Sequence, residues 1–101
     1  MSDLLAWLQA FYRDQCDGAR EHQAGISIET VDNQGWLVEI DIEGTRLARR
    51  AFRPVQTERS EHDWLQCHMD SGSFIGAGGP DNLTEILTIF RDWAETPSSP
   101  N

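Results

Sequence analysis

The sequence predicts an α+β domain, with a helix at each end of the chain and a four- to five-stranded antiparallel sheet between them. Apolar residues recur every three or four positions over residues 3–16 and again over 83–94, which is typical of amphipathic helices. Several short segments between them alternate apolar and polar residues, as strands do when one sheet face is buried. Because two amphipathic helices can cover one face of a twisted sheet, we expect both to pack on the same face.

The first helix is expected over residues 3–16, with Ser2 or Asp3 as its N-cap. The sequence Cys16-Asp17-Gly18 then ends this helix, because glycine readily adopts the left-handed conformation found at helix C-termini. The apolar stripe of the helix consists of Leu4, Leu5, Trp7, Leu8, Phe11 and Tyr12.

The strongest local signal is a hairpin of residues 25–31 and 36–42, joined by a turn at 32–35. The inward positions are expected to be Ile26, Ile28 and Thr30 in the first strand and Trp36, Val38, Ile40 and Ile42 in the second. The outward set is Glu29 with Val31, and Leu37 with Glu39 and Asp41. The hairpin therefore predicts an acidic ridge in which apolar residues are embedded.

The later strands give weaker signals. Residues 52–59 are expected to form an edge strand, because Pro54 has no N–H to donate within a central ladder. Residues 63–69 alternate and place Trp64, Gln66 and His68 on the face opposite Leu65, Cys67 and Met69. Residues 73–77 are expected to return as a short strand, and the glycine-rich segment 76–80 to act as a flexible connector.

Asn82 and Glu85 stand in the N-x-x-E arrangement of a capping box, which predicts the start of the last helix. Its apolar stripe consists of Leu83, Ile86, Leu87, Phe90, Trp93 and Ala94. Since no linker divides the chain, we expect residues 1–96 to form a single domain and 97–101 to be a disordered polar tail.

The composition is strongly acidic, with 17 Asp and Glu against 8 Lys and Arg in 101 residues, for a formal charge of −9. Such a surface repels nucleic acid and anionic membranes and attracts basic partners, although acidity also serves solubility. The N-terminal segment has neither the basic start of a secretory signal nor an uninterrupted apolar span. We therefore expect a cytoplasmic protein with reduced thiols and no membrane contact.

Metal and thiol chemistry are the alternatives to a binding function. Cys16, His22, Cys67 and either His62 or His68 are the conceivable zinc ligands, but no C-x-x-C or H-x-x-x-H pair is present. Cys16 falls at a helix C-terminus, where the helix dipole opposes a thiolate, and Cys67 lies within a strand. We expect no metal, no cofactor and no enzymatic activity. The alternative is a small metal- or thiol-dependent enzyme, sulfurtransferase-like, that uses Cys16 and Cys67.

Four segments follow one another along the chain: QCDGAREHQAGISIETVDNQGW, EIDIEGT, SEHDWLQC and GAGGPDNLTEILTIFRDWAE. Together, and in this order, they resemble the immunity protein 53 family of bacterial polymorphic toxin systems. The resemblance runs from about Leu5 to Glu95. Arg20 stands where a tryptophan is expected, and Gln34 where a proline is usual. The resemblance implies a cytoplasmic antitoxin without enzymatic activity, which binds the C-terminal domain of a cognate toxin.

Charge and resemblance together indicate how such a toxin is bound. A toxin that attacks nucleic acid needs a basic cleft, and an acidic ridge can occupy it as a polyanion mimic. The candidate partner-binding residues are Glu29, Leu37, Glu39 and Asp41 on the hairpin and Asp17, Glu21 and His22 in the loop before it. We expect a monomer or a weak dimer, the latter formed through an edge strand.

Overall fold

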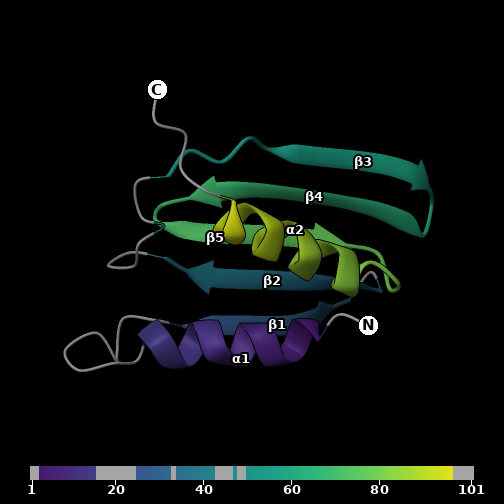
Figure 1. Cartoon of the computed structure of the whole chain (residues 1–101). Helices are drawn as coiled ribbons and strands as arrows, with labels where there is room; N and C mark the ends of the chain where they lie inside the picture. Colours follow the sequence, from purple (N-terminus) through teal and green to yellow (C-terminus); the bar gives the residue numbers. More distant parts are fainter. Residues whose placement is uncertain (1–2, 16–24, 33, 43–46, 48–49, 97–101) are drawn as a thin grey trace.

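The computed structural model describes residues 3–15, 25–32, 34–42, 47 and 50–96. In chain order its elements are α1 (Leu4–Gln15), β1 (Ile26–Val31), β2 (Gly35–Asp41), β3 (Val55–Ser60), β4 (Asp63–Asp70), β5 (Ser73–Gly78) and α2 (Leu83–Glu95). The five strands form one antiparallel sheet in the order β1-β2-β5-β4-β3 (Figure 1). The predicted α+β class is confirmed, with five strands.

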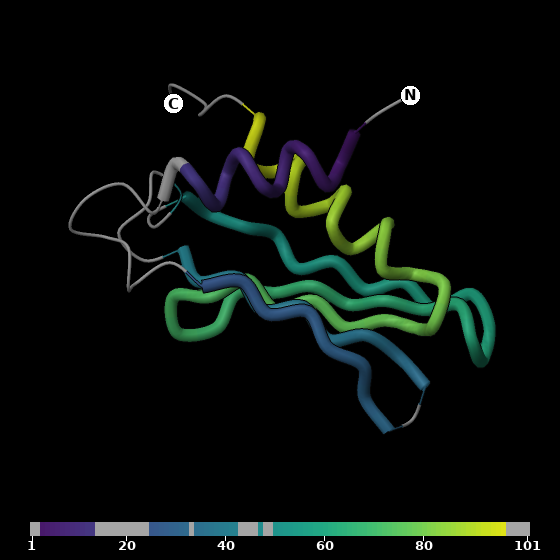
Figure 2. The backbone as a smooth tube through the Cα atoms, turned by 90° about the horizontal axis from the view of Figure 1, so that it is seen from below, coloured from purple at the N-terminus to yellow at the C-terminus, as the bar shows by residue number. Residues whose placement is uncertain are grey.

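Both helices lie on the same side of the sheet, as predicted (Figure 2). α2 packs on β4 and β5, and α1 packs against α2. Phe90 is completely buried at the centre of this layer, with its ring centroid between 5.0 and 5.9 Å from the centroids of four other aromatic rings. These rings belong to Trp7, Phe11, Phe74 and Trp93. The aromatic cluster joins both helices to β5.

Several local predictions are confirmed. The side chain of Asp3 accepts a hydrogen bond from the N–H of Ala6 at 3.1 Å and so caps α1. Val38, Ile40 and Ile42 are buried, as the alternation along their strand predicts. The third strand lies at the sheet edge, but it begins at Val55, directly after Pro54. The predicted stop at Cys16-Asp17-Gly18 and the tail at 97–101 lie outside the described residues.

The prediction of a flexible connector from Gly76 onwards is wrong for its first residues, because β5 continues through Gly76 and Gly78. A Cβ added to Gly76 would overlap Cγ2 of Ile86, and one added to Gly78 would lie 3.0 Å from Cδ1 of Ile86. These two glycines leave the space that α2 needs to lie directly on the strand.

The capping box predicted for Asn82 and Glu85 is wrong. Asn82 occupies the N-cap position, but its side chain makes no capping bond to the helix. Its Oδ1 accepts the backbone N–H of Trp64 at 3.3 Å, and its Nδ2 donates to Asp63 at 3.0 Å and to Glu85 at 3.2 Å. Arg59 donates to the same two carboxylates, each at 2.8 Å. Asn82 therefore ties the start of α2 to the β3–β4 hairpin.

The Asp63 carboxylate makes this connection sensitive to acid. Hydrogen bonds from Arg59 and then from Asn82 lower the pKa of Asp63 from 3.8 to about 2. A carboxyl with a lowered folded pKa contributes stability fully above its unfolded pKa, and this contribution is lost as the pH falls through the folded pKa. In urea titrations we expect Asp63→Asn to reduce the loss of unfolding free energy between pH 3.8 and about 2. Glu61→Gln, in the turn of the same hairpin, is the matched control; an unchanged pH slope in Asp63→Asn would contradict the prediction.

Gln34, in the β1–β2 turn, has a backbone conformation that residues other than glycine rarely adopt. Its φ is 63°, in the left-handed region, and its N–H donates to the C=O of Val31 at 3.1 Å. A proline, the residue expected here from the family resemblance, has φ fixed near −65° and no N–H, so it cannot form this turn. We expect Gln34→Gly to raise the unfolding free energy by about 0.5–1 kcal/mol and Gln34→Pro to lower it by about 2 kcal/mol. Chemical denaturation of both variants measures these changes in unfolding free energy. If the proline variant is as stable as the wild type, Gln34 does not have the left-handed conformation and the hydrogen bond described here.

Candidate partner-binding face

The helices cover one side of the sheet, and neither of them lies on the other side (Figure 2). Residues directly paired across antiparallel strands project to the same side, so the register identifies the side chains of this second side. One row runs from Ser27 through Glu39 and Ile75 to His68, and the next from Glu29 through Leu37 and Ala77 to Gln66. We call this side the outer face; it also carries Asp41, Glu58, Trp64 and Asp70.

The outer face is acidic. It carries the carboxylates of Glu29, Glu39, Asp41, Glu58 and Asp70, and no strand position described on it holds an arginine. The chain contains no lysine, so arginine supplies its positive charge. Two of the arginines are engaged on the helix side of the sheet. Arg50 donates to the C=O of Trp93 at 2.9 Å, at the end of α2, and Arg59 binds Asp63 and Glu85.

Apolar side chains lie in the middle of this acidic face. Leu37 on β2 is paired with Glu29 on one side and Ala77 on the other, and Ile75 on β5 is paired with Glu39 and His68. Leu37, Ile75 and Ala77 are all half-buried. A small apolar centre surrounded by charged side chains is the usual composition of a protein–protein interface, in which the centre loses water and the rim remains polar.

The structure places four of the seven predicted site residues on the outer face. Glu29 and Glu39 are exposed, and Leu37 and Asp41 are half-buried. The hydroxyl of Ser27 donates to Glu29 Oε2 at 3.1 Å. The other three residues, Asp17, Glu21 and His22, lie outside the described residues. Contact of any of the seven with a partner stays a prediction.

The part of the face that β3, β4 and β5 contribute was not predicted from the sequence. The alternation of residues 63–69 did place Trp64, Gln66 and His68 together, and the structure confirms that Cys67 and His68 project to opposite sides. What was missing was the strand order, which puts β5 beside β2 and so Ile75 and Ala77 beside the hairpin. Without that order, these two residues had no predicted neighbours.

Cys67 is a core residue. It is 1% exposed on the helix side of the sheet, and burial, followed by the nearby Glu85 carboxylate, raises the pKa of its thiol to about 12. Because the thiolate is the nucleophile and the metal ligand, this environment gives the thiol-enzyme alternative no support. Among the described residues, no three His, Cys, Asp or Glu side chains are grouped so that they could hold a metal ion. Cys16 lies outside these residues.

The fold and the outer face define a small α+β domain with one helix-covered and one open, acidic sheet surface. The chain belongs to the immunity protein 53 family, whose family model matches residues 5–95. No curated protein and no solved structure matches it. In the described part of the chain, neither helix is long and apolar enough to cross a membrane.

Proposed function

We propose that this immunity protein neutralises a cognate toxin of a bacterial polymorphic toxin system by binding the toxin's C-terminal domain through the outer face. Membership of the immunity protein 53 family supports the immunity role. The observation that carries the binding mode is the grouping of five carboxylates around the apolar centre of Leu37, Ile75 and Ala77.

In this proposal the two components of the face have different roles. The carboxylates attract a basic toxin surface and accelerate association, which suits a nuclease whose cleft is built to bind a polyanion. The apolar centre loses its water in the complex and slows dissociation. Inhibition then requires only that the bound protein blocks the cleft, without a catalytic step, a cofactor or a metal. The protein acts in the cytoplasm of the producing cell, as a monomer.

Co-expression with the C-terminal toxin domain encoded by the adjacent upstream gene tests this function. We expect the cells to survive and the two proteins to co-purify as a stable one-to-one complex. Survival without a complex would contradict direct binding and indicate an indirect mode of protection. Cell death despite co-expression of the folded protein would contradict the pairing itself.

A further inference from the structure

The strand β1 has an open backbone edge. The N–H of Asp41 donates to the C=O of Gly25 at 2.9 Å, and in an antiparallel pair every second residue is bonded to the neighbouring strand. The register therefore directs the backbone groups of residues 27, 29 and 31 to β2. The N–H and C=O groups of Ile26, Ile28 and Thr30 point away from β2, toward a side where the described residues contribute no strand.

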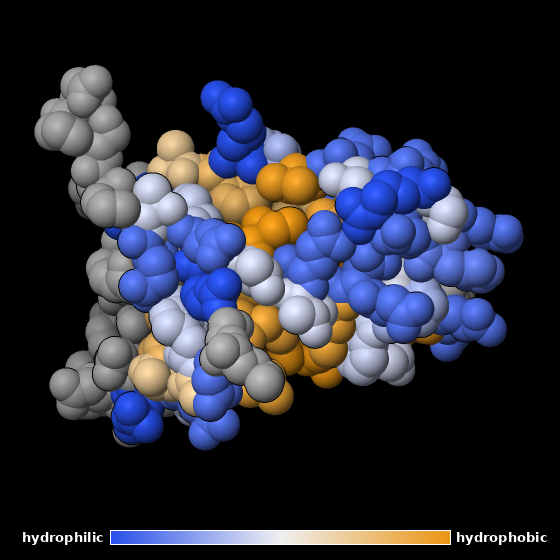
Figure 3. Space-filling view, turned by 45° about the vertical axis from the view of Figure 1, so that its right-hand side comes forward, coloured by the Kyte–Doolittle hydropathy of each residue, from blue (hydrophilic) through white to orange (hydrophobic). Residues whose placement is uncertain are grey.

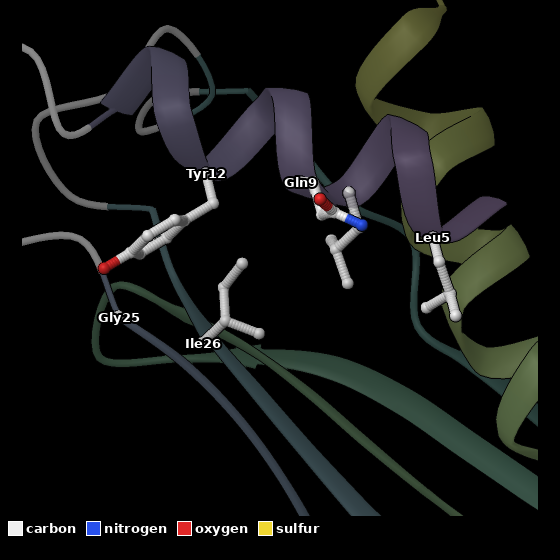
Figure 4. Close-up of a pocket in the computed structure, with 6 residues that line it drawn as sticks. Leu5, Gln9, Tyr12, Gly25 and Ile26 are labelled. Carbon is white, nitrogen blue, oxygen red and sulfur yellow. The ribbon is translucent and has the colours of Figure 1, made fainter. Parts of the chain in front are cut away.

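An apolar groove lies beside this open edge. Leu5, Gln9 and Tyr12 of α1 face Gly25 and Ile26 across it (Figure 4), and its volume is about 480 Å³. Leu5 of α1 is 61% exposed, and Ile28 on the helix side of β1 is 38% exposed. Both values are high for large apolar side chains located where a helix lies over a sheet. Figure 3 shows apolar surface exposed between hydrophilic areas on the helix side of the molecule.

The open edge and the groove are placed so that a single added strand would occupy both. A strand added beside β1 would pair with Ile26, Ile28 and Thr30, and residues paired in this way project to the same side. Every second side chain of the added strand would then point beneath α1, into the groove. The side chains between them would emerge on the outer face, opposite Ser27 and Glu29.

We propose that the open edge of β1 and the groove beneath α1 bind an extended segment of the toxin in which apolar and basic side chains alternate. This inference rests on the proposed function and extends the interface from the outer face to the sheet edge. The apolar side chains enter the groove beside Leu5 and Ile26. A basic side chain opposite Glu29 pairs with it, and one opposite Ser27 reaches over this small residue to Glu39, its partner on β2.

Charge favours this segment over a second copy of the same chain. Two copies joined through β1 would bring together two molecules of formal charge −9, with a Glu29 carboxylate from each at the junction. Arg13 is the only basic residue in α1 and β1, so these elements offer little positive charge to offset that repulsion. A basic partner strand meets the same carboxylates favourably.

A peptide titration tests the edge directly, independently of any toxin. The probe is a short capped peptide of alternating arginine and valine, added to the full-length ¹⁵N-labelled protein. We expect the amide signals of Ile26, Ile28 and Thr30 to shift and their hydrogen exchange to slow at least tenfold. N-methylation of the valine amides, which would face β1, should abolish binding. N-methylation of the arginine amides, which would face away, should not.

Three outcomes of this titration would overturn the inference. The first is unchanged hydrogen exchange at Ile28 and Thr30 when the peptide is saturating. The second is equal binding of the two N-methylated peptides, because that would reduce the interaction to adsorption by charge. The third is a dimer in sedimentation experiments that protects these amides without peptide, because the second copy would then be the occupant.

Two variants connect the edge to the toxin. Ile28→Pro removes an N–H that points to the open edge while leaving the β1–β2 ladder intact, and Ile28→Val is its matched control. Leu5→Glu places a charge in the groove at a position that is already exposed. We expect Ile28→Pro and Leu5→Glu each to weaken toxin binding at least tenfold, and Ile28→Val to have little effect.

The failure of this inference is distinguishable from failure of the proposed function. If charge reversal on the outer face prevents toxin binding while Ile28→Pro and Leu5→Glu bind normally, the proposed function stands and the edge inference is wrong. If the wild-type protein binds no toxin, the proposed function fails, and the peptide titration alone decides whether the edge accepts a strand. If Ile28→Pro does not fold, Leu5→Glu gives the same test from the helix side.

Discussion

Reversing the charges of Glu39 and Asp41 together is expected to weaken toxin binding by about 10–100-fold at low salt, mainly through slower association. Both carboxylates belong to the outer face, on the strand that carries Leu37 at its apolar centre. In the proposed complex they attract basic side chains of the toxin, and salt screens that attraction. The wild-type affinity should therefore fall steeply with salt, and the affinity of the double variant much less. Surface plasmon resonance over a range of salt concentrations measures both effects.

The matched control for this prediction is the double variant Glu61→Lys with Asp81→Lys. It changes the net charge by the same amount at exposed positions in the β3–β4 turn and before α2. The toxin affinity of this control should remain close to that of the wild type if binding depends on where the charges lie and not only on the net charge of the protein. Equal weakening by both double variants would reduce the effect to net charge, and unchanged binding by the Glu39 and Asp41 variant would remove the outer face as the interface.

Phe90→Ala is expected to lower the free energy of unfolding by about 3–5 kcal/mol, a large share of the stability of a small domain. Phe90 is 0% exposed, and its ring contacts those of Trp7, Phe11, Phe74 and Trp93. Removing it opens a cavity where α1, α2 and β5 meet, and these elements cannot all move inward to close it. Urea denaturation followed by tryptophan fluorescence measures the change.

Thr88→Ala, in the same helix, controls for the change in helix propensity. Thr88 is half-buried and does not belong to the aromatic cluster, so its replacement should alter the stability by less than about 1 kcal/mol. A loss below about 1.5 kcal/mol in Phe90→Ala would contradict the central position of Phe90, because it would mean that neighbouring side chains fill the space.

The elements of the fold could be predicted because each has a local cause in the sequence. Alternation along residues 25–42 defined the first hairpin and its two sides, and the spacing of apolar residues defined both helices. Asp3 capped α1 as expected, because an N-cap depends on an N–H only three residues away. The same alternation predicts that Glu29, Leu37, Glu39 and Asp41 share one side of the hairpin, as they do in the structure.

The features that could not be predicted depend on contacts between segments distant in the sequence. Asn82 has the residue type of an N-cap, but its side chain binds Trp64 and Asp63 of β4, and the helix pattern contains no information about β4. Gly76 and Gly78 belong to a motif typical of connectors, yet they lie in β5, where the absence of a side chain lets Ile86 of α2 pack closely on them. The strand order has no local signal in the sequence. Without it, Leu37 could be predicted on the outer face, but its apolar neighbours Ile75 and Ala77 on β5 could not.

Strand β2 interleaves residues with two separate roles. Val38 and Ile40 point into the core, whereas Leu37, Glu39 and Asp41 between and beside them belong to the outer face. Because neighbouring residues project to opposite sides, replacing one set changes the surface while leaving core packing intact. If the outer face is the interface, as proposed, variants of this protein that differ only at these outer positions should retain the fold and differ in the toxin that they bind. The surface of β2 can thus change during evolution in response to changes in a toxin, while the core residues and the fold stay the same.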